Sequence, residues 1–374
     1  MDTFIPLIIP DVEFDDIEAD FRQILNTGIL SSGPYVGKFE KSIANRVGVD
    51  HAVATTSATS ALHLALMAVG VGPGDEVLVP DFTFPATANA VIQTGAAPVF
   101  VDSYADGFMM DPEHARMLVS ERTRVIMPVD SFGQPADHKT LECLAHEVGA
   151  LLVVDAACSL GAARGGMECG AHGDMGCFSF HPRKVITCGE GGMVTTNDSS
   201  LATRLRLLRN HGSQKPEGDG RVLEFVEPGF NYRLSEMPAA LGLEQMKRLD
   251  RIISDRQVTA SRYDKALVDL PELWIPGPPT ETTWSYQSYV VVLEDGIDRE
   301  VVIAGMADGG IETTIGTYAC HQQPAFASWG RDREDLSNSA RFADRSLTLP
   351  VIPRMSMSQV DRVVETLVSV LKCV

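Results

Sequence analysis

The sequence predicts an α/β protein with a large domain built on a mostly parallel sheet that helices cover, and a smaller α+β domain towards the C-terminus. Between about residues 57 and 210, short apolar segments alternate with longer helical stretches. The apolar segments show no polar alternation, which is typical of strands buried on both faces of a sheet. The chain has 374 residues, of which 44% are hydrophobic, so it can bury a large core and form more than one compact lobe.

The alternating elements follow one another in a regular order. Short strands separated by helical stretches indicate a parallel sheet covered on both faces. The expected helices cover residues 59–69, 85–93, 112–119 and 138–148, and the expected strands cover 76–79, 98–101, 124–129 and 151–154. Ligands of such sheets gather at the carboxyl ends of the strands. Asp155, which follows the last of these runs, is therefore expected at such an end.

The pattern changes after about residue 235. One long helix, expected over residues 235–264, links the large domain to a second one that starts near Pro271, where proline and glycine become frequent. A strand at 288–293 and helices at 299–308 and 358–371 give this second part its α+β character. We therefore expect three parts, namely an N-terminal segment at 1–30, a large domain at 31–245 and a small C-terminal domain at 246–374.

Composition and charge exclude several classes of partner. The net charge of −19 at pH 7 argues against non-specific binding to nucleic acid or to an anionic membrane. No apolar run approaches the roughly 20 residues of a membrane span, and the first residues lack the features of a signal peptide. The seven cysteines include no C-x2-C pair, so neither a zinc site nor a disulfide scaffold is indicated. We expect a soluble cytoplasmic protein without a metal.

Lys184 stands in a setting that suits covalent binding of an aldehyde cofactor. Ser179 precedes it, a glycine cluster at 189–192 follows it, and Asp155 ends an apolar run upstream. A lysine can hold pyridoxal phosphate as a Schiff base, while an acid pairs with the pyridine nitrogen so that the ring withdraws electrons. Hydroxyl and amide donors can hold the phosphate. Taken alone, the lysine pattern also suits an ordinary surface turn.

Further segments extend this pattern over nearly the whole chain. They lie at residues 33–40, 57–62, 83–89, 177–192, 229–234, 239–245 and 349–350. In this order they resemble the motifs of the DegT/DnrJ/EryC1/StrS aminotransferases, which aminate keto-sugars. The resemblance implies a fold type I aminotransferase that binds pyridoxal 5'-phosphate in its large domain. It also implies that the N-terminal segment packs on the small domain.

The resemblance assigns expected roles around the cofactor ring. Lys184 would hold the cofactor and, once released, move the proton between the substrate carbon and the cofactor carbon. Asp155 would keep the pyridine nitrogen protonated, and Phe84 would stack on the ring. Cys158 is a departure, because related sequences often carry glutamine or histidine there. Cysteine is a weaker hydrogen-bonding residue, so the contact at this position is in doubt.

A second group of residues is expected around the phosphate. Ala58 and Thr59 would begin a helix whose free amides and dipole attract the phosphate, although related sequences usually have glycine at the position of Ala58. Ser179 would add a hydroxyl. Asn231 corresponds to a residue that reaches the phosphate from the partner subunit. Arg233 lies beside it and suits either an anionic substrate or an interface salt bridge.

The resemblance also implies residues near the sugar. His181 and His321 match such positions, with a purely structural role as the alternative for each. The expected reaction moves an amino group, from glutamate as in relatives, to a keto-sugar, most simply a nucleotide-linked 4-keto sugar. An inosose or 3-keto-sugar aminotransferase and a non-catalytic cofactor-binding paralogue remain as alternatives. A related class that removes a hydroxyl carries histidine in place of the lysine, so Lys184 counts against it.

The active unit is expected to be a homodimer with shared sites. In related proteins the segment 229–233 reaches into the cofactor pocket of the partner subunit. A polar stretch at 213–220 precedes this segment and is predicted to be a mobile surface loop. Such a loop could bring Asn231 towards a neighbouring subunit, and a twofold dimer would then carry two equivalent pockets.

Overall fold

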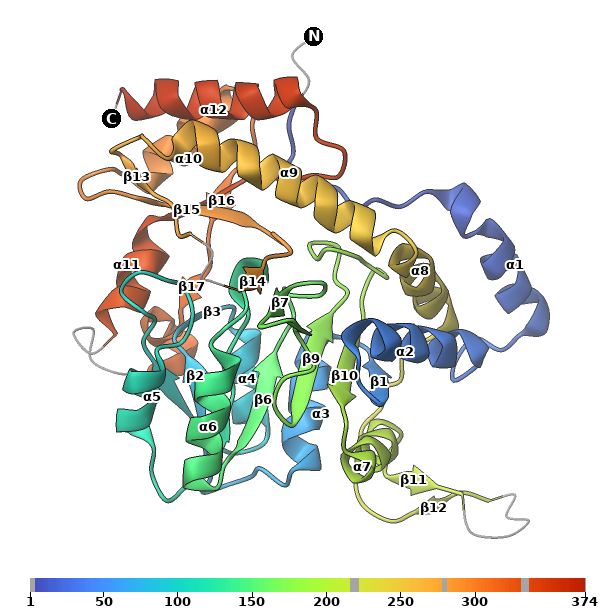
Figure 1. Ribbon diagram of the computed structural model, residues 1–374. Coiled ribbons are helices and arrows are strands. Elements are labelled where there is room, and N and C mark those ends of the chain that lie inside the picture. The colour runs from blue at the N-terminus through green and yellow to red at the C-terminus, as the bar shows by residue number, and fades with distance from the viewer. Residues whose placement is uncertain (1–3, 216–221, 278–280, 331–335, 374) are drawn as a thin grey trace.

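A seven-stranded sheet forms the centre of the large domain in the computed structural model, which describes residues 4–215, 222–277, 281–330 and 336–373 (Figure 1). The strands lie in the order β1-β10-β9-β6-β5-β2-β4. Six of them run in one direction, and β10 alone runs against its neighbours β1 and β9. The strands are β1 (His51–Thr55), β2 (Glu76–Pro80), β4 (Ala97–Val101), β5 (Thr123–Ile126), β6 (Leu151–Asp155), β9 (Met175–Ser179) and β10 (Gly192–Thr196).

Helices cover both faces of this sheet, which confirms the predicted α/β class. Successive strand residues point to opposite faces. Val153 accordingly belongs to the hydrophobic cluster under α3, α4 and α7, whereas Leu152 and Val154 belong to the cluster under α2, α5, α6 and α8. These helices are α2 (Pro34–Val47), α3 (Ala58–Ala68), α4 (Ala86–Gln93), α5 (Pro112–Leu118), α6 (His138–Val148), α7 (Ser199–Arg209) and α8 (Glu236–Met246).

A four-stranded antiparallel sheet, in the order β13-β15-β18-β16, forms the small domain. Its elements are β13 (Leu273–Trp274), β15 (Tyr289–Leu293), β16 (Thr314–Ile315), β18 (Ser346–Leu349), α9 (Leu249–Leu267), α10 (Arg299–Asp308), α11 (Ser337–Arg345) and α12 (Met357–Leu371). Helix α9 runs from α8 across this domain (Figure 1). Ile5 is buried in the small-domain core, whereas Ile17 and Ile24 near and in α1 (Glu18–Thr27) belong to the large-domain core. The N-terminal segment therefore touches both domains.

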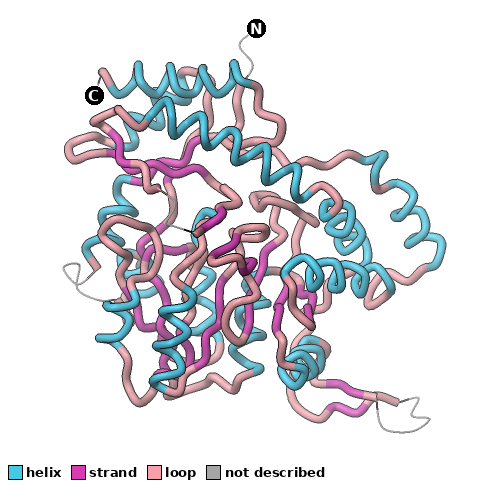
Figure 2. Tube along the Cα trace, in the orientation of Figure 1, coloured by secondary structure: helices cyan, strands magenta, loops and turns pink. Residues whose placement is uncertain are grey.

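Short strands join segments that lie far apart in the sequence (Figure 2). The pair β3–β17 connects the end of β2 to the small domain, and β14 pairs with β7. The hairpin β11–β12 projects from the body of the molecule beside α7 (Figure 1). The bounds are β3 (Phe82–Thr83), β7 (Ala163–Arg164), β8 (Met167–Glu168), β11 (Ser213–Gln214), β12 (Glu224–Phe225), β14 (Thr282–Thr283) and β17 (Tyr318–Ala319), with 3-10 helices η1 (Phe14–Asp16), η2 (Ser131–Gly133), η3 (Cys320–Gln322) and η4 (Pro324–Phe326).

Two of the elements expected from the sequence differ in the structure. The single helix expected over 235–264 is wrong, because α8 ends at Met246 and α9 begins at Leu249. The break lets α8 pack into the large-domain core while the second half of α9 packs into the small-domain core. The loop expected at 213–220 begins in β11, and residues 216–221 lie outside the described residues.

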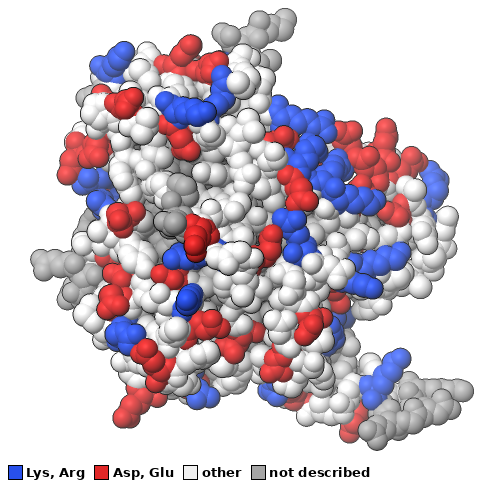
Figure 3. Space-filling view, in the orientation of Figure 1, with Lys and Arg blue, Asp and Glu red and all other residues white. Residues whose placement is uncertain are grey.

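The surface carries charges of both signs, and the cysteines are free thiols. Acidic and basic side chains are interspersed on the face seen in Figure 3. Among the described residues, no helix is long and apolar enough to cross a membrane. All seven cysteines lie in the described part of the chain, and none of them forms a disulfide.

Candidate active site

Lys184 lies in the loop that connects β9 to β10, at the carboxyl end of the parallel strands. This loop is closed by main-chain bonds from Phe180 N to Gly191 O (2.9 Å) and from Cys188 N to Phe180 O (3.0 Å). The half-buried Lys184 directs its Nζ towards Cys158, at 3.0 Å from the sulfur. The structure thus brings together two of the predicted site residues, one from the lysine loop and one from the turn after β6.

Asp155 ends β6 and is 4% exposed. Its carboxylate accepts hydrogen bonds from the Thr87 hydroxyl (2.8 Å) and from the Ala157 amide (3.1 Å). Burial raises the pKa of Asp155, and these two donors together with the positive charge of Lys184 oppose that rise only in part. The carboxylate therefore lacks a strong cationic partner within the described protein, and a cation that bound beside it would be stabilised.

The N-terminus of α3 lies at the same end of the strands. Thr55 at the end of β1 pairs with Gly192, and Gly192 pairs with Ser179 at the end of β9. A Cβ at Gly192 would come within 2.3 Å of Ser57 O, so the absence of a side chain lets α3 approach β10. Ser57 caps the helix through a capping box with Ser60. The amides of the first two helical residues, 58 and 59, remain outside the helical hydrogen-bond ladder.

Phe84 follows β3 and is 65% exposed, which is unusual for a phenylalanine beside a sheet edge. Its ring lies 6.3 Å from that of Tyr318, which belongs to β17. Thr87, the residue that donates to Asp155, also lies 3.4 Å from Phe84 O. Thr87 therefore links the main chain of Phe84 to the buried carboxylate of Asp155.

The two predicted histidines occupy different surroundings. The side chain of His321 is 5% exposed and packs against Asp81 of the large domain, with Nδ1 2.5 Å from Asp81 Oδ2 and the His321 amide donating to Asp81 Oδ1 (2.7 Å). Its Nε2 is buried and makes no hydrogen bond with the described residues. His181 lies in the lysine loop, with Nε2 3.9 Å from Glu190 Oε1. Burial lowers the pKa of His181, and the charge of Glu190 opposes that effect.

Asn231 and Arg233 lie in the segment that follows β12, where both contact Asn210. Arg233 donates to Asn210 Oδ1 (2.6 Å), and Asn231 forms an isolated bridge with Asn210. Asn231 is exposed. Tyr232 between them contacts His63 Nδ1 at 3.1 Å. In the described part of the chain, no hydrogen bond links Asn231 or Arg233 to the lysine loop.

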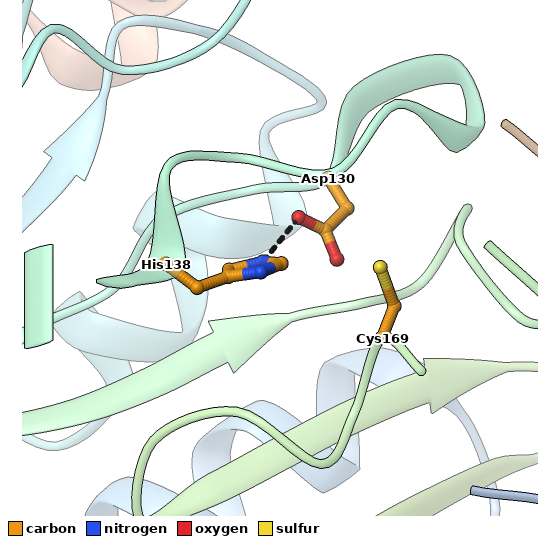
Figure 4. A group of neighbouring side chains, drawn as sticks. All are labelled: Asp130, His138 and Cys169. Carbon is orange, nitrogen blue, oxygen red and sulfur yellow. Dashed lines mark hydrogen bonds and ion pairs between the residues drawn. The ribbon is translucent and has the colours of Figure 1, made fainter. Parts of the chain in front are cut away.

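A buried network that was not predicted from the sequence lies behind this site, and Figure 4 shows three of its residues, Asp130, His138 and Cys169. Asp130 accepts a hydrogen bond from the Ser159 hydroxyl (2.8 Å) and contacts His138 Nε2 (2.7 Å), and Cys169 lies beside them. All four residues are fully buried. Burial alone would raise the pKa of Asp130, but His138 and the other donors lower it overall. The Asp130 amide donates to Asp155 O (3.0 Å), so this network supports the strand end that carries the acid.

Two small-domain residues that were also not predicted contact the main chain of Cys158 and of Arg183, the residue before Lys184. Ser285 Oγ donates to Cys158 O (3.3 Å), and Gln287 Nε2 donates to Arg183 O (2.8 Å). These contacts span more than a hundred residues of sequence, and no local pattern announces them.

Comparison with known proteins places this geometry in a family. The model of the DegT/DnrJ/EryC1/StrS aminotransferase family matches residues 12–368. GDP-perosamine synthase of Caulobacter vibrioides is 38% identical over 349 residues, with 92% of each chain covered. DesV of S. venezuelae, solved with a ketimine intermediate, has a TM-score of 0.91 at 33% identity and 97% coverage of both chains. Spr1654 from Streptococcus pneumoniae, in its PLP form, has a TM-score of 0.92 at 26% identity, covering 99% of this chain and 98% of that one.

Proposed function

The chain belongs to the DegT/DnrJ/EryC1/StrS aminotransferase family and is an enzyme, and from this premise we propose that it moves an amino group from glutamate to a nucleotide-linked 4-keto sugar with pyridoxal 5'-phosphate. The observation that carries the proposal is that three features lie together at the carboxyl ends of the parallel strands. They are a half-buried lysine, a buried carboxylate without a strong cationic partner, and a helix N-terminus with free amides.

These features fit the cofactor part by part. Lys184 would hold it covalently, and Asp155 would pair with its ring nitrogen, which would provide the cation that the buried carboxylate lacks. Phe84, whose ring is exposed, would cover the ring face. When bound, the cofactor supplies an electron sink for the carbon that gains or loses the amine.

The phosphate would lie between two elements that the sheet brings together. The amides of Ala58 and Thr59 at the start of α3 offer donors and the positive end of the helix dipole. Ser179, 8% exposed at the end of β9, offers a hydroxyl. Alanine at position 58 supplies the same amide as glycine, because the donor belongs to the main chain.

Lys184 would also act on the proton that moves during transfer. Once released from the cofactor, its amine would take a proton from the substrate carbon in one direction and return it in the other. Cys158 lies 3.0 Å from this amine, where its weakly polar sulfur contacts the lysine. We assign His181 and His321 to the substrate side, since one lies in the lysine loop and the other carries a buried Nε2 free for a further bond.

The sugar class rests on the lysine motif and on one relative. The motif F-S-F-H-x-x-K with a later G-E-G-G resembles that of enzymes that aminate C4 of keto-sugars. GDP-perosamine synthase, at 38% identity, supports a nucleotide-linked sugar.

We propose that the active unit is a homodimer in which each chain completes the pocket of its partner. Asn231 is exposed and, among the described residues, makes no hydrogen bond with the lysine loop of its own chain, which suits a residue that serves a neighbouring pocket. The projecting hairpin beside it exposes four apolar side chains, namely Val222, Leu223, Phe225 and Val226. Exposed apolar groups of this kind are typical of a protein contact.

Two measurements test the proposal. Reduction of the purified protein with borohydride, followed by peptide mapping, should place a pyridoxyl group on Lys184, one of eight lysines. A panel of keto-sugar nucleotides with glutamate as donor should then yield an amino sugar detected by mass spectrometry. A label on another lysine would overturn the assignment of Lys184, and amination of an inosose alone would overturn the assignment of the substrate.

A further inference from the structure

We propose that Ser285 and Gln287 are positioning residues of the reaction, which hold the Lys184–Cys158 pair in place from the small domain. This inference rests on the proposed function of Lys184. The two residues belong to a segment, here called the wedge segment and defined as residues 284–287, that lies between the small domain and the lysine loop.

The wedge segment donates hydrogen bonds to one main-chain carbonyl in each of the two loops that carry Lys184 and Cys158. Gln287, 6% exposed, donates to Arg183 O, the carbonyl directly before Lys184. Ser285, fully buried, donates to Cys158 O. The lysine and the cysteine come from different loops, and their side chains meet at 3.0 Å. One small segment therefore fixes the two loops relative to each other.

The wedge segment is itself held in an uncommon conformation. Tyr286 has a φ of 47°, in the left-handed region that a bulky residue rarely adopts. Such a conformation persists only where the surroundings impose it, and it occurs preferentially at functional sites. Arg256 of α9, fully buried, imposes it here by donating from Nη1 to both Tyr286 O and Gln287 O, each at 3.1 Å.

The large domain is shaped to receive this segment. Gly133 has a φ of 90°, and a Cβ there would come within 2.4 Å of Ser285 Oγ. Ser285 N donates to Gly133 O (3.2 Å), and Ser288 N donates to Phe132 O (3.3 Å). The close approach places the wedge segment against the turn that also carries Asp130, and it makes Gly133 necessary for the position of Ser285.

This arrangement predicts a specific effect on Lys184. A misplaced reacting group lowers a rate strongly even when binding is intact. Removing the Gln287 donor should therefore slow attachment of the cofactor to Lys184 and lower kcat, while KM for the amino donor stays close to its normal value. Loss of one typical neutral hydrogen bond corresponds to about fivefold, which is the effect expected.

The test compares two buried glutamines that each donate to a main-chain carbonyl. Gln287→Met keeps the side-chain length and removes the donor. Gln245→Met does the same in α8, where Gln245, 1% exposed, donates to Asp11 O (2.6 Å) away from the lysine loop. Cofactor-free protein would be mixed with pyridoxal phosphate, quenched with borohydride at timed intervals and assayed by mass spectrometry for the label on Lys184.

Gln287→Met should label about five times more slowly than the native protein and Gln245→Met. Equal labelling rates for Gln287→Met and the native protein, or an equal slowing in Gln245→Met, would overturn the inference. If Gln287→Met does not fold, Ser285→Ala removes only the bond to Cys158 O and should slow labelling in the same direction. Absence of label on Lys184 in the native protein would instead overturn the proposed function.

Discussion

Replacement of Asp155 by asparagine should separate catalysis from stability. Asparagine has nearly the same shape and keeps the bonds that hold this side chain. Its carbonyl oxygen can accept from the Ala157 amide, and its NH2 group can donate to the Thr87 hydroxyl. Thr87 can then direct its own proton to Phe84 O, which lies at 3.4 Å. The change therefore removes a charge with little change in geometry.

The expected loss of activity follows from that charge. A carboxylate and a cation about 4 Å apart interact by about 4 kcal/mol at an effective dielectric constant of about 20. Asp155 is 4% exposed, so solvent screens this interaction weakly. If the interaction supports the protonated ring nitrogen during transfer, its loss should lower kcat by roughly a thousandfold.

The expected effect on stability has the opposite sign. Because burial raises the pKa of Asp155, the folded protein binds this proton more tightly than the unfolded chain does. Cofactor-free native protein should therefore lose stability as the pH rises from about 3.9 through the raised pKa, and the asparagine variant should not. At pH 7 the free energy of unfolding of cofactor-free Asp155→Asn should equal or exceed that of the native protein.

Two assays are needed, namely steady-state turnover with bound cofactor measured by absorbance, and denaturant unfolding of the cofactor-free protein. Near-normal turnover of Asp155→Asn with cofactor bound would refute the role of the charge. A large loss of stability would show instead that the carboxylate is a structural group.

Two further predictions concern assembly and pH. Mixing an inactive Lys184→Ala subunit with an inactive subunit that carries Asn231→Ala and Arg233→Ala should restore part of the activity, because mixed dimers have one intact pocket. Turnover measures the activity, and light scattering measures the assembly state. No recovery of activity despite proven subunit exchange would contradict the shared site. Burial lowers the pKa of His172, which stacks on His138, to about 4. The free energy of unfolding should therefore fall as the pH decreases from 6.5 to 4, because only the unfolded chain gains this proton. Denaturant titrations of His172→Gln should show a weaker dependence of this free energy on pH. An unchanged dependence on pH in His172→Gln would contradict the prediction.

Much of the large domain could be predicted because its strands are apolar and its helices are separated from them by turns. The strands β2, β4, β5 and β6 and the helices between them lie close to their expected positions. The strands β1, β9 and β10 were not anticipated. Their pairing, including the antiparallel β10, joins residues far apart in the sequence, and local pattern carries no information on such pairing.

The candidate site divides in the same way. Lys184 and Asp155 could be named because each stands beside a recognisable local pattern. The buried pair of Asp130 and His138 could not, since neither residue type predicts burial without knowledge of its partner. Gln287 was missed because its contact with Arg183 O depends on how two domains meet, and a lone glutamine in the sequence does not reveal this.

The hydrogen bonds from the wedge segment to main-chain carbonyl oxygens determine which substitutions this sequence can tolerate. Every residue has a main-chain carbonyl, so the bonds from Ser285 and Gln287 place no demand on the side chains at positions 158 and 183. Cysteine can therefore stand where related sequences often carry glutamine or histidine, while the turn that carries it stays anchored. Substitutions at position 158 are free to alter the chemistry beside Lys184, whereas the two donors and Gly133 must be retained for the loops to keep their places.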